Sequence, residues 1–197
     1  MTPVISPFSL FFASIFTSNI LLANFLGMCS FISISKDMKS SNGLGLAVVV
    51  VLTVTTGVNW AVLHLILIPL GLVYLRFIVF IIVIAAVVQM LEMIIDRVSQ
   101  TLYMSLGIFL PLITVNCAIL GVSLFMEIRN YSFIQSIIFG LGSGLGWWLA
   151  IMLLSAMRKK IEKAPVPAGL QGSGITMITI GFMAMAFMGF SGMLQVQ

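Results

Sequence analysis

Charged side chains are scarce in this chain. Of 197 residues, nine are Lys or Arg and five are Asp or Glu, so charged residues make up only 7% of the sequence. An average soluble domain contains about 25% charged residues. So few charges cannot coat the surface of a water-soluble protein of this length. This excludes an ordinary soluble enzyme, a nucleic-acid-binding domain and a disordered chain.

Apolar residues take the place of the missing charges and make up 61% of the sequence. A membrane-spanning helix needs roughly 20 mostly apolar residues, and six segments meet this requirement. We therefore predict an all-α integral membrane protein with one membrane domain over residues 1–197. The predicted spans are Phe8–Ile34, Gly43–Leu63, Phe77–Ile95, Leu102–Phe125, Phe133–Met157 and Ile175–Leu194.

The few cations predict the orientation of these spans. The loops Ser35–Asn42, Asp96–Gln100 and Arg158–Gly174 contain seven Lys and Arg residues. The loops Pro69–Arg76 and Glu127–Tyr131 contain two. Because cytoplasmic loops carry the excess of Lys and Arg, the first three loops are predicted to be cytoplasmic and both termini periplasmic. We interpret the basic loop at 158–174 as orientation charge and expect no nucleic-acid partner.

The six spans divide into two halves, at about residues 1–100 and 101–197, with three spans in each. Because three is odd, the second half enters the membrane from the opposite side, so the halves would form inverted repeats. Two glycine-containing pentads at corresponding positions, Ser41–Gly45 and Gly142–Gly146, give weak support. We predict two inverted three-helix repeats.

The two cysteines, Cys29 and Cys117, lie in the first span of each half. Gly27 precedes one of them, and Pro111 and Asn116 precede the other, so we predict a broken helix near each cysteine. Three interpretations are open: buried free thiols, a disulfide, or ligands of an iron–sulfur cluster. A cluster requires four thiolates as a rule. If one is bound, a second protein must supply the remaining two.

Several motifs resemble a family of membrane subunits shared by two redox pumps. These pumps are the Na⁺-translocating NADH:quinone reductase, with its D and E subunits, and the Rnf ferredoxin:NAD⁺ complex, with its A and E subunits. The resemblance covers essentially the whole chain, and the long central motif is highly specific. The matching segments are Gly107–Gly121 (GIFLPLITVNCAILG), Phe25–Cys29 (FLGMC), Val166–Gly172 (VPAGLQG) and Ala186–Gly192 (AFMGFSG).

Within this family, the segments Asn116–Gly121, Gly146–Ile151 and Gly174–Thr176 look most like the E subunit of the quinone reductase. The segments Leu67–Leu70 and Tyr74–Arg76 look more like the A subunit of the Rnf complex. The resemblance to the reductase implies an oxidoreductase subunit in the inner membrane of a bacterium. It would relay electrons from NADH towards ubiquinone, coupled to Na⁺ export. A function of another class, a free-standing ion transporter, also suits inverted repeats.

The resemblance also implies a site and partners. Cys29 and Cys117 match the family's cluster ligands, so this chain would supply two of the four cysteines of one 2Fe–2S cluster near the middle of the membrane. The homologous six-span D subunit would supply the other two. Flavin-bearing membrane subunits and an NADH-oxidising subunit would complete the assembly within the lipid bilayer.

Two further polar residues lie in or beside predicted spans. Glu92 lies near the end of the third span, where it could belong to an ion path or anchor the span end, with Arg97 neutralising its charge. His64 lies at the outer end of the second span, and we expect it at the membrane interface. The sequence gives no role to Trp147 or Trp148.

Overall fold

The computed structural model describes residues 7–98, 113–165 and 167–190, and every regular element in these ranges is a helix. This agrees with the predicted all-α membrane protein. Three of its segments are long and apolar enough to cross a membrane: Met38–Leu70, Val73–Ile94 and Phe133–Ile161. The α-helices are α1 (Pro7–Ile15), α2 (Met28–Ile34), α3 (Met38–Val62), α4 (Ile68–Leu70), α5 (Arg76–Val98), α8 (Cys117–Ile128), α9 (Phe133–Ile161) and α10 (Ser173–Met188).

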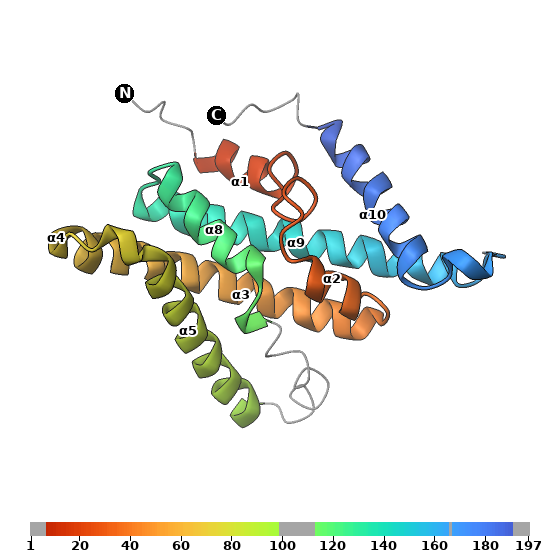
Figure 1. The fold of residues 1–197 in the computed structure, drawn as a ribbon, viewed down its shortest axis with the longest axis horizontal. Coiled ribbons are helices and arrows are strands. Elements are labelled where there is room, and N and C mark those ends of the chain that lie inside the picture. Colours follow the sequence, from red (N-terminus) through yellow and green to blue (C-terminus); the bar gives the residue numbers. More distant parts are fainter. Residues whose placement is uncertain (1–6, 99–112, 166, 191–197) are drawn as a thin grey trace.

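The long helices α3 and α9 pack against each other in opposite directions and form the centre of the molecule (Figure 1). Small residues allow this close approach. A Cβ atom on Gly144 would lie 2.8 Å from the Cα atom of Val49, and one on Gly140 would lie 3.0 Å from the carbonyl oxygen of Leu52. Glycines four residues apart let two membrane helices bring their backbones together. The glycine-rich stretch of α9 therefore has a packing role.

The first predicted span is broken, as expected near Cys29. Helix α1 ends at Ile15 and α2 begins at Met28. Both lie along α9: a Cβ atom on Gly146 would be 3.0 Å from the Ile15 carbonyl oxygen, and Arg158 donates to the Ile32 carbonyl at 2.9 Å. The two pieces thus follow successive halves of α9, and the break lies between them.

Helix α8 begins at Cys117, which confirms the second predicted break. The rest of the predicted span Leu102–Phe125 lies largely outside the described residues. Figure 1 shows α2 and α8 starting near the middle of the molecule and running towards opposite ends. This is the arrangement expected of corresponding helices in inverted halves. The complete set of six spans in two repeats stays a prediction.

Two loops are shorter than predicted. The loop Ser35–Asn42 is mostly helical, because the Asp37 side chain accepts a hydrogen bond from the Ser40 amide and α3 begins at Met38. Asp is a favoured N-cap residue, so it starts the helix earlier than hydropathy alone indicates. The predicted turn at Pro69–Arg76 is also shorter. A π-helical segment, η1 (Leu63–Leu67), and α4 continue the helix to Leu70, and Gly71 ends it with φ 70°.

The remaining boundaries differ by a few residues from the predictions. Helix α9 continues to Ile161, and α10 begins at Ser173 after the short 3₁₀ helix η3 (Ala168–Leu170). A second 3₁₀ helix, η2 (Val73–Leu75), leads into α5. The charged residues at the end of α9 extend the helix beyond the apolar segment from which its end was predicted.

The loops gather at two ends of the molecule. Lys36 and Arg158 line one cavity, so the first and fifth predicted loops lie together. Arg76 forms an ion pair with Glu127, and the Trp60 indole donates to the Tyr131 carbonyl at 2.9 Å, so the second and fourth loops also lie together. This agrees with the grouping that the charge count predicted for these four loops, whereas the third predicted loop, Asp96–Gln100, lies partly outside the described residues. The side of the membrane that each end faces stays a prediction.

Candidate functional site

The two cysteines lie where the broken helices begin. Cys29 is the second residue of α2, and Cys117 is the first residue of α8. The Gly27 amide donates a hydrogen bond to the Cys117 Sγ atom at 2.9 Å. Both thiols are free. The structure therefore joins two segments that are far apart in the sequence into one site with two unbridged cysteines.

The site lies at the middle of the long helix α9. Trp147 is the central residue of Phe133–Ile161 and is completely buried. Its Nε1 atom would be 2.9 Å from a Cβ atom on Gly27. At about 1.5 Å per residue, a helix of this length spans roughly 43 Å. The cysteine-bearing segments therefore meet at mid-length of a helix that is long enough to cross a bilayer.

Gly27 makes this meeting possible. Its φ is 87°, and a Cβ atom there would lie 3.0 Å from the Asn116 Oδ1 atom and 3.1 Å from the Ala118 Cβ atom. A left-handed backbone conformation is unfavourable for residues with a side chain. The space is also filled by α8 and Trp147. Glycine is therefore required here for both its conformation and its size.

Asn116 holds the start of α8 and ties it to α2. Its Oδ1 atom accepts from the Ala118 amide at 3.0 Å, which caps the helix. Its Nδ2 atom donates to the Ser30 Oγ atom at 3.2 Å. A break in a membrane helix leaves backbone groups that need polar partners. The Asn116 side chain supplies one such partner.

Sequence reasoning missed Asn19, which stabilises the other break. Its buried Nδ2 atom donates to the carbonyl oxygens of Ile15 at 3.0 Å and Gly146 at 2.9 Å. Its Oδ1 atom accepts from the amides of Leu21 and Leu22. An asparagine within an apolar segment is itself the signal that could have identified it, because hydrocarbon offers it no partner.

The cysteines differ in exposure. Cys29 is exposed and Cys117 is partly buried. Apolar side chains on the segments before the two cysteines are also exposed: Phe25 is 51% and Val115 is 79% exposed. Within the described ranges, no three His, Cys, Asp or Glu side chains come together as a metal site. The two thiols are therefore at most part of a ligand set.

Glu92 lies apart from the cysteines. It is partly buried on the last part of α5, which points away from the other helices in Figure 1. Arg97, expected to neutralise it, is exposed, and within the described part of the chain Glu92 forms no ion pair. Its proposed roles stay predictions.

The other singled-out aromatic residues have structural contacts. His64 is exposed, and its ring stacks on Trp60 with the centroids 4.0 Å apart. Trp147 packs against Phe31 in the core, whereas the Trp148 indole donates to the Asn42 Oδ1 atom at 3.1 Å. The two adjacent tryptophans therefore have different contacts: one fills the core and the other links α9 to α3.

Comparison with known proteins extends these findings. Residues 7–194 match the family described as Rnf-Nqr subunit, membrane protein. The chain is 54% identical over 190 residues to the E subunit of the Na⁺-translocating NADH-quinone reductase of Photorhabdus laumondii and, over the same length, to that of Yersinia enterocolitica. It is 52% identical over 194 residues to the E subunit of the same reductase from Psychromonas ingrahamii. Each alignment covers 93% of this chain and 96% of the relative.

Proposed function

Because the chain belongs to the Rnf-Nqr family of membrane subunits, we propose that it is the E subunit of a Na⁺-translocating NADH:quinone reductase. Three relatives with that name share 52–54% of their residues with it over nearly their whole length. These identities favour the reductase over the Rnf complex, which the segment around Leu67–Leu70 resembles. Membranes containing the chain should reduce quinone with NADH. Activity only with reduced ferredoxin and NAD⁺ would assign the chain to the Rnf complex instead.

Cys29 and Cys117 supply two of the four ligands of a 2Fe–2S cluster in this proposal. The observation that carries it is the hydrogen bond from the Gly27 amide to the Cys117 Sγ atom, which places the two cysteine segments side by side. Backbone amides that donate to cluster sulfurs are one of the protein's means of setting a reduction potential. Soft thiolate donors are also the ligand type that such clusters select.

The exposure of Cys29 supports a partner that completes the ligand set. An exposed cysteine, on segments that also expose Phe25 and Val115, can bind iron together with a second chain. We infer that this second chain is the homologous six-span D subunit. Flavin-bearing and NADH-oxidising subunits complete the assembly. The apolar side chains around the thiols would then be buried at the contact and exclude water from the cluster.

A bound cluster would accept and donate single electrons. Residues of this chain would hold the cluster in position. Asn116 caps the start of α8, Asn19 hydrogen-bonds to backbone groups at the first break, and the Gly27 amide donates to the Cys117 sulfur. These contacts support a position of the proposed relay near the middle of α9. From there, electrons can pass between partners on the two sides of the membrane, coupled to Na⁺ export.

Purification of the complex tests this function directly. The chain should co-elute with other subunits and with iron, and the reduced complex should show the electron paramagnetic resonance signal of a 2Fe–2S cluster. The competing function, a free-standing ion transporter, predicts an iron-free oligomer of this chain alone that moves ions. That result would refute the cluster and the reductase together.

The orientation is proposed from the charge count. We place Lys39 and Lys163 in the cytoplasm and both termini in the periplasm of a bacterial inner membrane. Cysteines introduced by Lys39→Cys and Lys163→Cys should react with an impermeant thiol reagent only in inverted vesicles. Labelling of either cysteine in intact cells, with the periplasm opened, would reverse the assignment.

Glu92 is proposed as a residue of the ion path, with anchoring of the span end as the alternative. Its partial burial on α5 and its lack of an ion pair within the described ranges support a carboxylate that is available to a cation. Glu92→Gln should raise the Na⁺ concentration that gives half-maximal turnover. The matched control, Glu162→Gln, should leave it unchanged. An unchanged Na⁺ dependence in Glu92→Gln would leave only the anchoring role.

A further inference from the structure

A cavity of about 470 Å³ lies at the end of the molecule where the first and fifth predicted loops meet. Three parts of the chain enclose it: the turn after α2, the last turns of α9 and the start of α10. Its polar wall contains Lys36, Arg158 and Thr176, and its apolar wall contains Ile161 and Ile175. The cavity is therefore cationic on one side and apolar on another, and it lies far along α9 from the cysteines.

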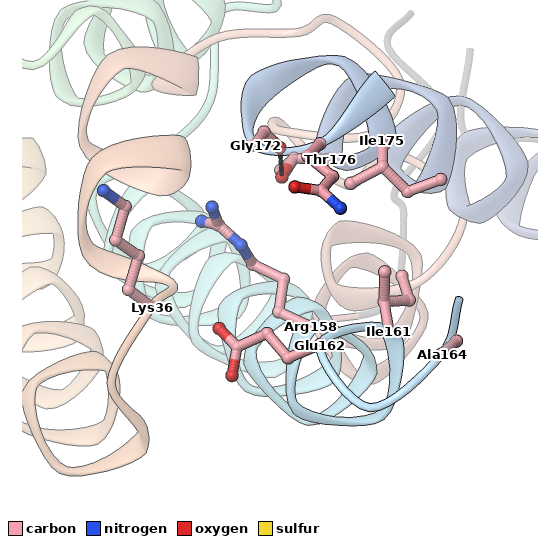
Figure 2. Close-up of a pocket in the computed structure, with 9 residues that line it drawn as sticks. Lys36, Arg158, Ile161, Glu162, Ala164, Gly172, Ile175 and Thr176 are labelled. Atoms are coloured by element: carbon pink, nitrogen blue, oxygen red, sulfur yellow. Dashed lines mark hydrogen bonds between the residues drawn. The ribbon is translucent and has the colours of Figure 1, made fainter. Parts of the chain in front are cut away.

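The two cations of this cavity, Lys36 and Arg158, outnumber its one carboxylate, Glu162. Figure 2 shows the Lys36 ammonium and the Arg158 guanidinium on the same side, below Gly172 and Thr176. Within the described ranges, neither cation forms an ion pair. Glu162 also lines the cavity, but its carboxylate points away from the guanidinium in Figure 2. The cavity therefore carries a local positive charge.

The Arg158 guanidinium is held in place and still has donors to offer. Its Nη1 atom donates to the Ile32 carbonyl at 2.9 Å and to the Ser35 Oγ atom at 2.6 Å. A guanidinium has five N–H donors. Both of these bonds come from Nη1, so they leave the N–H groups of Nε and Nη2 for a ligand. A guanidinium fixed in this way is suited to bind a phosphate with two parallel hydrogen bonds.

The start of α10 adds to the positive potential. Gly172 is its N-cap residue and has no side chain to cap the first amides of the 16-residue helix. Helix N-termini attract anions through these amides and the helix dipole. The two cations and the uncapped helix start, on different elements, thus face one space.

We propose that this cavity binds the phosphate of an anionic membrane phospholipid such as phosphatidylglycerol. Phosphate chemistry follows from the guanidinium, the ammonium and the amides. A lipid is the source because the cavity lies at the polar end of α9, a helix long enough to cross the membrane, where headgroups lie. Basic pockets between membrane helices bind such headgroups. Ile161 and Ile175 would contact the glycerol and the first methylenes.

The test uses the purified complex after detergent washing, titrated with short-chain phosphatidylglycerol and followed by its thermal midpoint. Lys36→Gln and Arg158→Gln should each weaken binding about fivefold or more, because each cation near a membrane surface contributes about 1 kcal/mol. Lys163→Gln is the matched control, since Lys163 does not line the cavity, and should bind as the unchanged complex does. Lys36 is exposed, so its variant stays informative if loss of Arg158 disturbs folding.

Several outcomes would overturn the proposal. One is equal lipid binding by all three variants, and another is equal binding of short-chain diacylglycerol, which has no phosphate. Inorganic phosphate that binds as tightly as the lipid would assign the site to a free anion. A lysine cross-link from Lys36 to a segment of another protein of the complex seated in the cavity would assign it to a protein. The signal of the cluster, recorded on the same samples, reports separately on the proposed function.

Discussion

The two cysteine segments have the same design but are stabilised differently. Before Cys117, the side chain of Asn116 caps the helix that follows. Before Cys29, Gly27 leaves α2 without a side-chain cap. Helix α2 is instead held from outside, by Ser30 bonding to Asn116 and by Arg158 at its far end. One half of the site is thus stabilised locally, whereas the other depends on its neighbours.

This difference has a consequence for the ligands. Cys117 already has a backbone donor to its sulfur, whereas Cys29 is exposed. In the proposed function, the Cys117 sulfur would therefore receive a backbone hydrogen bond when the cluster is bound. The Cys29 half, with its exposed neighbours, would become fixed when the partner subunit covers it.

The largest expected effect separates ligation from packing. Cys29→Ser and Cys117→Ser should each abolish the 2Fe–2S signal and the flow of electrons to quinone, because serine replaces a soft donor by a hard one. Subunit levels should fall only in part, since serine keeps the size of the side chain. Paramagnetic resonance of the purified complex measures the signal. An intact signal in both variants would leave the cysteines as free thiols that bind no cluster.

Gly27→Ala should disrupt the contact between the two halves. The left-handed conformation adds strain of about 1–3 kcal/mol. Insertion of a methyl group 2.9–3.1 Å from three neighbouring atoms adds about 1–3 kcal/mol more. Chemical unfolding of the complex should show a clear loss of stability and reduced iron content.

The control for this variant is Gly71→Ala. Gly71 has a similar φ of 70°, but nothing lies within 4 Å of its added Cβ atom. It should show the conformational strain without the collision and should retain iron. If the two variants lose equal stability, the close packing at Gly27 does not contribute.

Asn116→Ala should have a smaller effect, on the start of α8 and on its link to α2. Loss of the cap removes about 1 kcal/mol, and loss of the bond to Ser30 about another 1 kcal/mol. Ser30→Ala keeps the cap but removes the bond from Asn116 together with the bond from the Ser30 hydroxyl to the Gly27 carbonyl, and so reports on the link to α2 without the cap. Equal stability of Asn116→Ala and the unchanged complex would show that the cap is dispensable.

The smallest effect is expected at Asp37, the exposed N-cap of α3. The Ser40 amide and hydroxyl donate to its carboxylate and lower the pKa of Asp37 below its usual 3.8. A group whose pKa is lowered by folding contributes stability above its unfolded pKa and loses it as the pH falls through the folded value. The unchanged protein should therefore lose a little stability as the pH falls below about 4, and Asp37→Asn should not show this loss. Thermal unfolding between pH 3 and 7 measures it, with Asp96→Asn as the control. An unchanged pH profile in Asp37→Asn would contradict the role of the carboxylate.

Sequence reasoning predicted the fold class, the breaks at both cysteines and the grouping of four of the five loops. These depend on local properties: long apolar segments, the helix-weakening Gly27, and the distribution of nine cations. The helix ends were less predictable. Asp37 caps α3, so this helix begins earlier than the apolar segment does. The charged end of α9 is also helical, although its residues lie outside the apolar segment from which the span was predicted.

The sequence by itself determined that this is an apolar helical protein with two cysteines at broken helices, because composition and backbone chemistry act locally. Only the tertiary structure decided what meets at the site. The contacts of Gly27 with Cys117, of Asn19 with Gly146 and of Arg158 with Ile32 join residues 90 to 127 positions apart. Such contacts depend on how α2, α8 and α9 pack. That packing arises from close approach at small residues, which no local pattern specifies.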